Sequence, residues 1–334
     1  MASGHPIFVV GAPRTGTTLV KEILNRHPLV HLFDEVHFFE RIYDDRDAIG
    51  DMGNPRAQSH AIQRIRAIVR DFGSDQRVAD HLTMEVYRRR LQGEGGGYRG
   101  LLATLLKAGA ELEGATYWGD SSPQDVLYLD TIHRWFPEAR IVALVRDPRG
   151  FLASCKNYYR RGVPTYRERY NPLTNSMLWR SYMRALVDAE ATPWGSLVLR
   201  VRYEDLVAEP EREVRRICDH VGIEYRTNMI DVERTNTSFV DGGGTGIVST
   251  SVDRWRGELS PTEIWIGQRV FGELMERFDY ASWSNGDGRL RPSALELARI
   301  LAVLPGRAYN LLFRTAKPFK LSKLKRVLSL FRAS

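Results

Sequence analysis

One stretch constrains the fold of this chain more than any other: Gly11 to Thr18, with the sequence GAPRTGTT. It follows an apolar, β-branched run at residues 7–10 and precedes a helical pattern at 19–25, so it predicts a strand, a glycine turn and a helix start. Such a turn lets backbone N–H groups and the positive end of the helix converge on one anion, which makes a phosphate the expected ligand. The spacing matches the nucleotide-binding P-loop, except that Thr17 replaces the lysine that contacts the outer phosphates of ATP or GTP.

Strand and helix patterns alternate along the rest of the chain. Apolar runs predict further strands at residues 30–33, 116–119, 139–145 and 197–201, with helical segments between them. This alternation favours an α/β fold with a parallel sheet. The expected architecture is P-loop NTPase-like, with three α/β/α layers around a central parallel sheet.

Charge divides the chain into two parts. The whole chain carries +7, but residues 289–334 contain eleven Lys and Arg against one acid, so this segment carries +10 and the remainder −3. Leucines and phenylalanines recur in the same segment at helical spacing, with basic residues between them. We therefore expect one main domain over residues 1–288 and a basic, amphipathic helical extension over 289–334.

Two interpretations of the extension are open. A basic amphipathic helix is typical of a segment that makes peripheral contact with an anionic membrane. The same pattern suits a helix that packs on the body of the protein, or on a second subunit in self-association, with its charges in water.

The remaining composition restricts the cellular context. The residues before the first predicted strand contain no secretory signal, and no apolar run approaches the length of a membrane span. Cys155 and Cys218 give neither a disulfide framework nor the spacing of a zinc site. We therefore expect a cytoplasmic protein, with the inner face of the membrane as the place of any peripheral contact, with no metal and with no nucleic-acid partner.

Three further motifs accompany the glycine loop. Arg146 and Ser154 lie eight residues apart after the predicted strand at 139–145, Tyr203 begins a Tyr-Glu-Asp-Leu segment, and residues 254–256 read Arg-Trp-Arg. In order and spacing, these motifs and the glycine loop together resemble the sulfotransferases that use 3′-phosphoadenosine-5′-phosphosulfate (PAPS). The resemblance extends from Pro6 to about Tyr280 and is greater to the carbohydrate and bacterial members than to the phenol and steroid ones.

The resemblance implies a role for each motif in binding PAPS. The residues concerned are Arg14, Thr15, Gly16, Thr17 and Thr18 for the 5′-phosphosulfate, Arg146 and Ser154 for the 3′-phosphate, Tyr203 for the adenine side, and Arg254, Trp255 and Arg256 for closing on the cofactor. Two separate anion-binding sites, the glycine loop and the pair Arg146 and Ser154, suit the two separate anionic groups of PAPS. A sulfonyl group carries less negative charge than a γ-phosphoryl group, so neither magnesium nor a P-loop lysine is required. The product would be adenosine-3′,5′-bisphosphate.

Transfer to a hydroxyl requires a base near the glycine loop. Glu35 follows the predicted strand at 30–33, and ligands of open parallel sheets gather at the carboxyl ends of strands. The sequence Glu-Val-His-Phe-Phe from Glu35 resembles the segment of heparan-type sulfotransferases whose glutamate is assigned as the base. We therefore predict in-line transfer with Glu35 as the general base and His37 as the reserve candidate. An ordinary surface or capping glutamate and a packed structural histidine are the alternatives.

One position departs from the family pattern. After an acid equivalent to Asp120, many members carry a lysine that reaches the bridging region of the cofactor, and here Ser121 stands in its place. Stabilisation of the leaving group would then fall to Arg14, to Thr17 or to an arginine of residues 158–169. Ser122, followed by proline, is also typical of a helix N-cap.

The sequence thus predicts a PAPS-dependent sulfotransferase that acts on a hydroxyl of a carbohydrate, a lipid-linked molecule or a small molecule. We expect its acceptor pocket to be formed by Phe38, Phe39, a loop or lid at residues 44–59, and residues 158–170. One alternative is a P-loop small-molecule kinase, which Thr17 disfavours. The other is a membrane-associated, non-catalytic adaptor, which the basic extension and Ser121 would suit.

Overall fold

The computed structural model describes residues 2–71, 76–161, 170–232, 247, 252–284 and 290–305 of the chain. Contacts divide these residues into two compact units, the first within 2–144, 188–232 and 247 and the second within 145–187, 252–284 and 290–305. This division runs through the predicted domain 1–288. The predicted boundary at 288–289 lies outside the described residues, so the separate extension stays a prediction.

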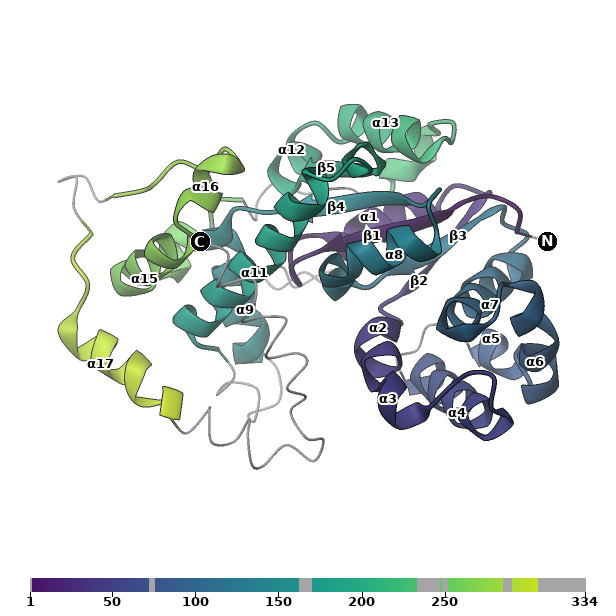
Figure 1. Cartoon of the computed structure of the whole chain (residues 1–334). Helices are drawn as coiled ribbons and strands as arrows, with labels where there is room; N and C mark the ends of the chain where they lie inside the picture. Colours follow the sequence, from purple (N-terminus) through teal and green to yellow (C-terminus); the bar gives the residue numbers. More distant parts are fainter. Residues whose placement is uncertain are drawn as a thin grey trace. The chain divides into compact units, whose positions relative to one another are not determined.

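A five-stranded sheet forms the centre of the first unit, in the order β2-β3-β1-β4-β5 (Figure 1). The strands are β1 (Pro6–Gly11), β2 (Val30–Asp34), β3 (Tyr117–Ser121), β4 (Arg140–Val145) and β5 (Val198–Arg202). The pairings of β1 with β3, β1 with β4 and β2 with β3 are all parallel, which confirms the predicted parallel sheet.

The register of the strands aligns their carboxyl ends. Gly11 at the end of β1 lies opposite Leu144 in β4, and Asp34 at the end of β2 lies opposite Ser121 at the end of β3. The glycine loop, the turn after β2 and the turn after β3 therefore leave the sheet at the same edge, where ligands of open α/β sheets bind.

One face of the sheet is covered by α1 (Thr17–Asn25) and α13 (Pro210–Val221). Both helices repeat buried apolar residues every three or four positions, as an amphipathic helix on a sheet requires. Alternate residues of the strands complete this core: Ile7, Val9, Val30, Leu32, Val142, Leu144 and Val201. The short helix α12 (Tyr203–Ala208) connects β5 to α13 and contributes Leu206 to the same core.

The opposite face carries larger rings. Phe8 and Trp118 pack on Phe136, with ring centroids 6.2 and 5.5 Å away, at the end of α8 (Leu129–Trp135). Helix α7 (Gly97–Leu112) covers Phe33 of β2 so closely that a Cβ at Gly109 would lie 2.4 Å from its ring. Helices on both faces confirm the predicted three-layer α/β/α arrangement.

Several short helices connect β2 to α7 along the chain. They are α2 (Phe38–Arg41), η1 (Tyr43–Asp45), α3 (Arg46–Ile49), α4 (Pro55–Asp71), α5 (Gln76–His81) and α6 (Met84–Gly93). The prediction of a loop over residues 44–59 is therefore wrong except at residues 50–54, which connect α3 to α4. Pro55 does not interrupt structure there but begins α4, because the first helical position needs no donated hydrogen bond.

The second unit is helical. It contains α9 (Pro148–Arg161), most of α11 (Pro172–Glu190), α14 (Trp255–Glu258), α15 (Pro261–Phe271), α16 (Glu273–Arg277) and α17 (Ala294–Ala302). Trp179 is fully buried against Phe271 and Phe278, at 5.1 and 6.1 Å between ring centroids. Across the described part of the chain, no helix has the combined length and apolar character needed to cross a bilayer.

The substitution Gly119→Ala tests the tight contact between β1 and β3. A Cβ at this position would lie 1.7 Å from the carbonyl oxygen of Ile7, so the two central strands would have to separate. We expect a loss of about 3 kcal/mol or more in the free energy of unfolding, measured in urea. Gly93→Ala at the end of α6 is the matched control, because no atom lies within 4 Å of its added methyl group. Equal stabilities of the two variants would contradict the described register.

Candidate active site

The glycine loop turns sharply between β1 and α1. Gly11, Arg14 and Gly16 have positive φ angles of 155°, 71° and 106°, and Gly16 is the N-cap residue of α1. Thr15 closes the turn, because its Oγ1 donates a hydrogen bond to the carbonyl oxygen of Ala12 at 2.6 Å. No side chain caps α1 and its first turn has no acidic residue, so the positive end of the helix is suited to an anion.

The ring of Tyr203 lies against this loop. A Cβ at Gly16 would lie 2.7 Å from Cδ2 of Tyr203, so the missing side chain of the glycine makes room for the ring. Tyr203 is the first residue of α12, directly after β5. The structure thus places Tyr203 beside the glycine loop, and its predicted contact with adenine stays a prediction.

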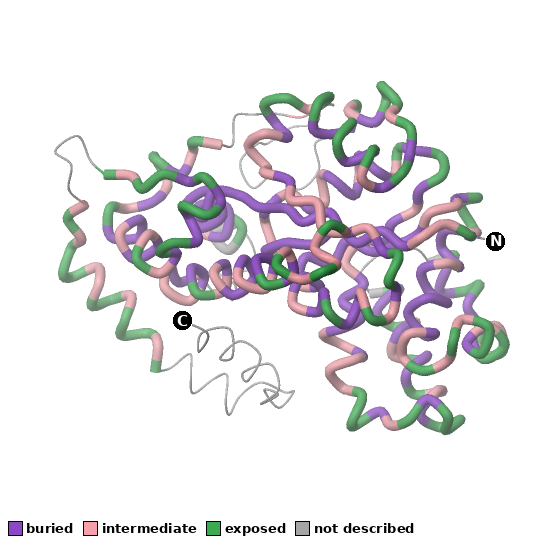
Figure 2. The backbone as a smooth tube through the Cα atoms, turned by 45° about the horizontal axis from the view of Figure 1, so that its top comes forward, coloured by how far each residue is buried: buried purple, intermediate pink, exposed green. Residues whose placement is uncertain are grey.

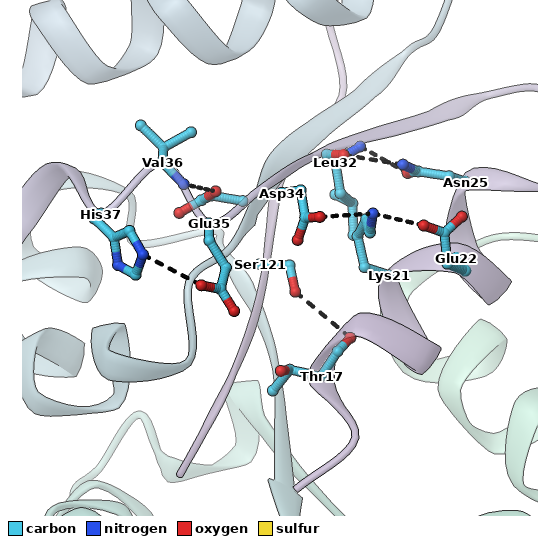
Figure 3. Close-up of polar contacts among 11 residues, drawn as sticks. Thr17, Lys21, Glu22, Asn25, Leu32, Asp34, Glu35, Val36, His37 and Ser121 are labelled. Atoms are coloured by element: carbon cyan, nitrogen blue, oxygen red, sulfur yellow. Dashed lines mark hydrogen bonds and ion pairs between the residues drawn. The ribbon is translucent and has the colours of Figure 1, made fainter. Parts of the chain in front are cut away.

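Glu35, Val36 and His37 form the turn between β2 and α2 (Figure 3). Glu35 and His37 have φ angles of 41° and 52°, in the left-handed region that side chains other than glycine rarely adopt. Two hydrogen bonds from the neighbouring strand end hold this turn: the Val36 N–H donates to Oδ1 of Asp120 at 3.2 Å, and the His37 N–H donates to Oγ of Ser122 at 2.9 Å.

Left-handed backbone coincides with the predicted catalytic residues. Among the residues that the structure describes, four residues other than glycine have positive φ: Arg14, Glu35, His37 and Asp279. Three of the four are the residues that the sequence analysis assigned to catalysis. Such conformations cost about 1–3 kcal/mol each and cluster at functional sites, so their coincidence is independent support for this edge of the sheet as the active site.

The imidazole of His37 lies among carboxylates. Its Nε2 is 3.2 Å from Oε2 of Glu35 and its Nδ1 is 3.4 Å from Oε2 of Glu40. Burial lowers the pKa of His37, but its interactions with the two carboxylates outweigh burial and raise the pKa to about 10. His37 is therefore an imidazolium near neutral pH, which argues against its reserve role as a base. The Glu35 side chain is 42% exposed, whereas that of His37 is 10% exposed.

Two buried carboxyl groups lie behind the turn. Asp120, at 1% exposure, has its pKa raised to about 6 by burial, despite hydrogen bonds that favour its charged form. Burial, and then the charge of Asp120, raise the pKa of Asp125 well above its usual range. The charge of His37 acts on both groups in the opposite direction. The sequence analysis missed Asp125, because a carboxylate in a 3₁₀ turn, η2 (Pro123–Tyr128), carries no recognisable pattern.

The two serines after Asp120 have different roles. Ser122 occupies the predicted N-cap position before Pro123, but its side chain does not cap η2 and instead accepts the His37 N–H. Ser121 Oγ donates to the carbonyl oxygen of Thr17 at 3.5 Å, so it links β3 to the start of α1. A buried serine therefore lies beside the glycine loop where many family members have a lysine.

Lys21 is a basic residue that the sequence analysis overlooked. Its side chain is 8% exposed, its Nζ donates to Oε1 of Glu22 at 2.7 Å, and Nζ lies 3.4 Å from Oδ2 of Asp34 (Figure 3). Lys21 thus ties α1, one turn after Thr17, to the residue that precedes Glu35. The sequence could have indicated that Lys21 lies near the glycine loop, because it comes four residues after Thr17 and residues four apart share a helix face.

The predicted 3′-phosphate residues belong to the second unit. Arg146 follows β4 and is 5% exposed, and Ser154 on α9 is 2% exposed. Arg146 packs over the start of α9, where a Cβ at Gly150 would lie 3.2 Å from its Nε. The adjacent Asp147 forms a bidentate pair with Arg149, with distances of 2.9 and 2.7 Å.

Trp255 is buried against two arginine side chains. Its side chain is 1% exposed and contacts the guanidinium groups of Arg149 and Arg256 at 4.3 and 4.5 Å from the ring centroid. The ring of Trp283 also packs on it, at 5.6 Å. Trp255 therefore organises arginines within the second unit, and its predicted part in closing on the cofactor stays a prediction. Arg254 is half-buried and Arg256 exposed.

Two residues predicted to line the acceptor pocket are buried instead. Phe38 and Phe39 are fully buried in an aromatic cluster, where Phe39 stacks on Tyr128 at 4.9 Å and on Trp135 at 5.4 Å. These rings stabilise the core and present no surface to an acceptor. Residues 162–169 of the other predicted wall lie outside the described residues.

Comparison with known proteins identifies related chains. A family model described as "Sulfotransferase family" matches residues 6–227, more than half of the chain. The chain is 26% identical over 287 residues to nodulation protein NoeE of Sinorhizobium fredii, covering 77% of this chain and 61% of that protein. It is 22% identical to protein-tyrosine sulfotransferase 2 of Gallus gallus, covering 90% of this chain and 76% of that protein. The chain thus spans less than two thirds of the nodulation protein, and 31% of a similar Aquifex aeolicus protein.

Solved structures show the same fold. The sulfotransferase domain of the Synechococcus PCC 7002 olefin synthase superposes with a TM-score of 0.54 at 22% identity, covering 84% of this chain and 97% of that domain. A sulfotransferase domain from the curacin biosynthetic pathway superposes with a TM-score of 0.53 at 15% identity, covering 84% of this chain and 99% of that domain.

The raised pKa of His37 predicts how its contribution to stability depends on pH. Because the pKa in the folded state lies above 6.5, the stabilisation by His37 is complete below about pH 6.5 and is lost as pH rises through about 10. The difference in unfolding free energy between the wild type and His37→Gln should therefore shrink steadily across this range, as urea titrations would measure. His60→Gln, at an exposed position on α4, is the control. A difference that does not vary with pH would refute the imidazolium.

Proposed function

Because the chain belongs to the sulfotransferase family, we propose that it moves the sulfonyl group of PAPS to an acceptor hydroxyl by in-line transfer. The observation that carries the proposal is the arrangement at one sheet edge, where the anion-binding glycine loop and the strained Glu35 turn both leave the ends of parallel strands. The loop supplies the donor side of the reaction and the turn supplies the base.

The 5′-phosphosulfate binds at the glycine loop. Backbone N–H groups of Gly16, Thr17 and Thr18 and the positive end of α1 stabilise its charge without a P-loop lysine. Arg14 lies within the loop and has a left-handed backbone conformation. We assign to its side chain the stabilisation of charge on the transferred group. Arg146 and Ser154 bind the 3′-phosphate, because a buried guanidinium can form charge-assisted hydrogen bonds with a phosphate and a hydroxyl can donate to it.

Glu35 is the general base. As the acceptor oxygen forms its bond to sulfur, the bond between sulfur and the bridging oxygen breaks, and adenosine-3′,5′-bisphosphate leaves with the electron pair. The acceptor proton passes to the exposed carboxylate of Glu35, which the His37 imidazolium orients from 3.2 Å. His37 acts as a positioning residue, since a group that is protonated at neutral pH cannot accept the proton.

The acceptor class is left to experiment. The proposed acceptors are carbohydrate, lipid-linked and small-molecule hydroxyls, and similarity to protein-tyrosine sulfotransferases adds the phenol of a peptide tyrosine. A screen of these classes with labelled PAPS would identify the acceptor. A P-loop kinase would instead bind ATP in the presence of magnesium.

Glu35→Gln should separate binding from chemistry. The amide keeps the shape of the side chain but cannot take a proton, so we expect turnover to fall about a thousandfold while adenosine-3′,5′-bisphosphate binds as before. Calorimetry measures the binding and transfer of labelled sulfate measures turnover. Glu85→Gln, at an exposed position on α6, should leave both unchanged. Normal turnover by the Glu35 variant would remove Glu35 from the role of base.

Arg146→Ala should weaken the binding of adenosine-3′,5′-bisphosphate by at least about a hundredfold, because a buried guanidinium partner of a phosphate is lost. Arg89→Ala, at an exposed position on α6, is the matched control. The same titration with ATP and magnesium tests the kinase alternative. Tighter binding of ATP than of the bisphosphate by the wild type would contradict the proposed donor.

A further inference from the structure

Helix α17 exposes its apolar side chains. Seven large hydrophobic residues are exposed among those that the structure describes, and three of them lie on α17 or at its C-cap: Leu295, Leu301 and Val303, at 62%, 45% and 47% exposure. None of the helix residues is buried, as Figure 2 shows by the absence of purple along this segment. Since a surface helix normally buries its apolar stripe, α17 requires a partner that the described residues of its own unit do not supply.

Polar contacts attach α17 to the second unit. Ser260 Oγ donates to Oε1 of Glu296 at 2.6 Å, and Asn171 Nδ2 donates to the carbonyl oxygen of Ile300 at 3.0 Å. Just before the helix, the Ser293 N–H donates to Oγ1 of Thr262 at 2.9 Å. These bonds orient the helix by its polar groups. Within the described part of the second unit, these bonds involve Ser293, Glu296 and Ile300, and the outward sector of α17 lies opposite to Glu296 and Ile300.

That outward sector is apolar and carries one basic residue. At 100° per residue, the exposed residues Leu295, Ala298 and Ala302 fall within about 60° of one another, and Leu301 and Val303 lie about 120° and 80° from Leu295 on opposite sides, so the exposed apolar face covers about half of the helix. Arg299, also exposed, lies beside Leu295 in the same projection. A side chain of this type keeps its charge in water while its stem lies along an apolar surface.

The positive charge that follows α17 in the sequence favours an anionic partner for this helix. Residues 306–334, which follow directly in the sequence, contain eight Lys and Arg and no acid. A second copy of the chain would bring the same positive charges together, which opposes association through this face. An anionic bilayer offers both complements, acyl chains for the leucines and phosphate or carboxylate headgroups for the basic residues.

We propose that α17 lies on the surface of an anionic bilayer, with Leu295, Leu301 and Val303 inserted at the boundary between headgroups and acyl chains. The contact is peripheral, because the helix has nine residues and binds through one sector. The polar bonds to Glu296 and Ile300 fix the orientation of the second unit on the membrane. The proposal does not depend on sulfonyl transfer.

Co-sedimentation of the full chain with vesicles tests this surface. Wild-type protein should bind vesicles of phosphatidylcholine with phosphatidylserine and not vesicles of phosphatidylcholine alone, and added salt should weaken the binding. The triple variant Leu295→Ser, Leu301→Ser and Val303→Ser should lower the partition coefficient at least about tenfold. The matched control replaces three other exposed hydrophobic residues by serine, namely Leu29, Leu112 and Met177, and should bind like the wild type.

Three results would overturn the proposal. They are failure of the wild type to bind anionic vesicles, equal binding by the triple variant, and equal loss of binding in the control variant. Sedimentation velocity without lipid examines the alternative partner. A wild-type dimer that the triple variant dissociates would assign the face to a second copy of the chain, whereas a monomer in both cases supports the membrane.

Discussion

Two hydrogen bonds at the end of β3 connect the fold of this protein to its chemistry. They join Oδ1 of Asp120 and Oγ of Ser122 to the backbone of the turn that carries Glu35. The turn is left-handed at two residues and would relax without these acceptors. The acceptors are in place because β2 and β3 pair in parallel, with Asp34 opposite Ser121. The position of the proposed base thus follows from the register of two strands.

The same strand end creates the electrostatic environment of the site. Asp120 and Asp125 are both 1% exposed, which makes two full negative charges there costly. The imidazolium of His37 compensates in part, and its own charge is stabilised by Glu35 and Glu40. A neutral histidine would leave the carboxylates to repel one another. His37 therefore serves the site as a fixed cation, which the sequence could not distinguish from a base because both roles require an imidazole.

Local sequence determined some features of this protein and tertiary packing determined others. The glycine loop and Glu35 were predictable, because each directly follows a recognisable strand. Lys21 and Asp125 were not, because their importance comes from partners on other elements. Dependence on tertiary packing also explains the wrong prediction for Phe38 and Phe39. Two adjacent aromatic residues have the same sequence pattern whether they line a pocket or fill a core.

Ser121 shows how a lost charge can be accommodated. The serine lies against the Thr17 carbonyl, where β3 meets α1. Thr17 itself replaces a second lysine, so neither strand end carries a cation to the glycine loop. Lys21 lies one helical turn after Thr17, but its ammonium group forms ion pairs with Glu22 and Asp34. At the loop itself, the α1 terminus and Arg14 supply positive potential, a combination that suits the smaller charge of a sulfonyl group better than that of a nucleoside triphosphate.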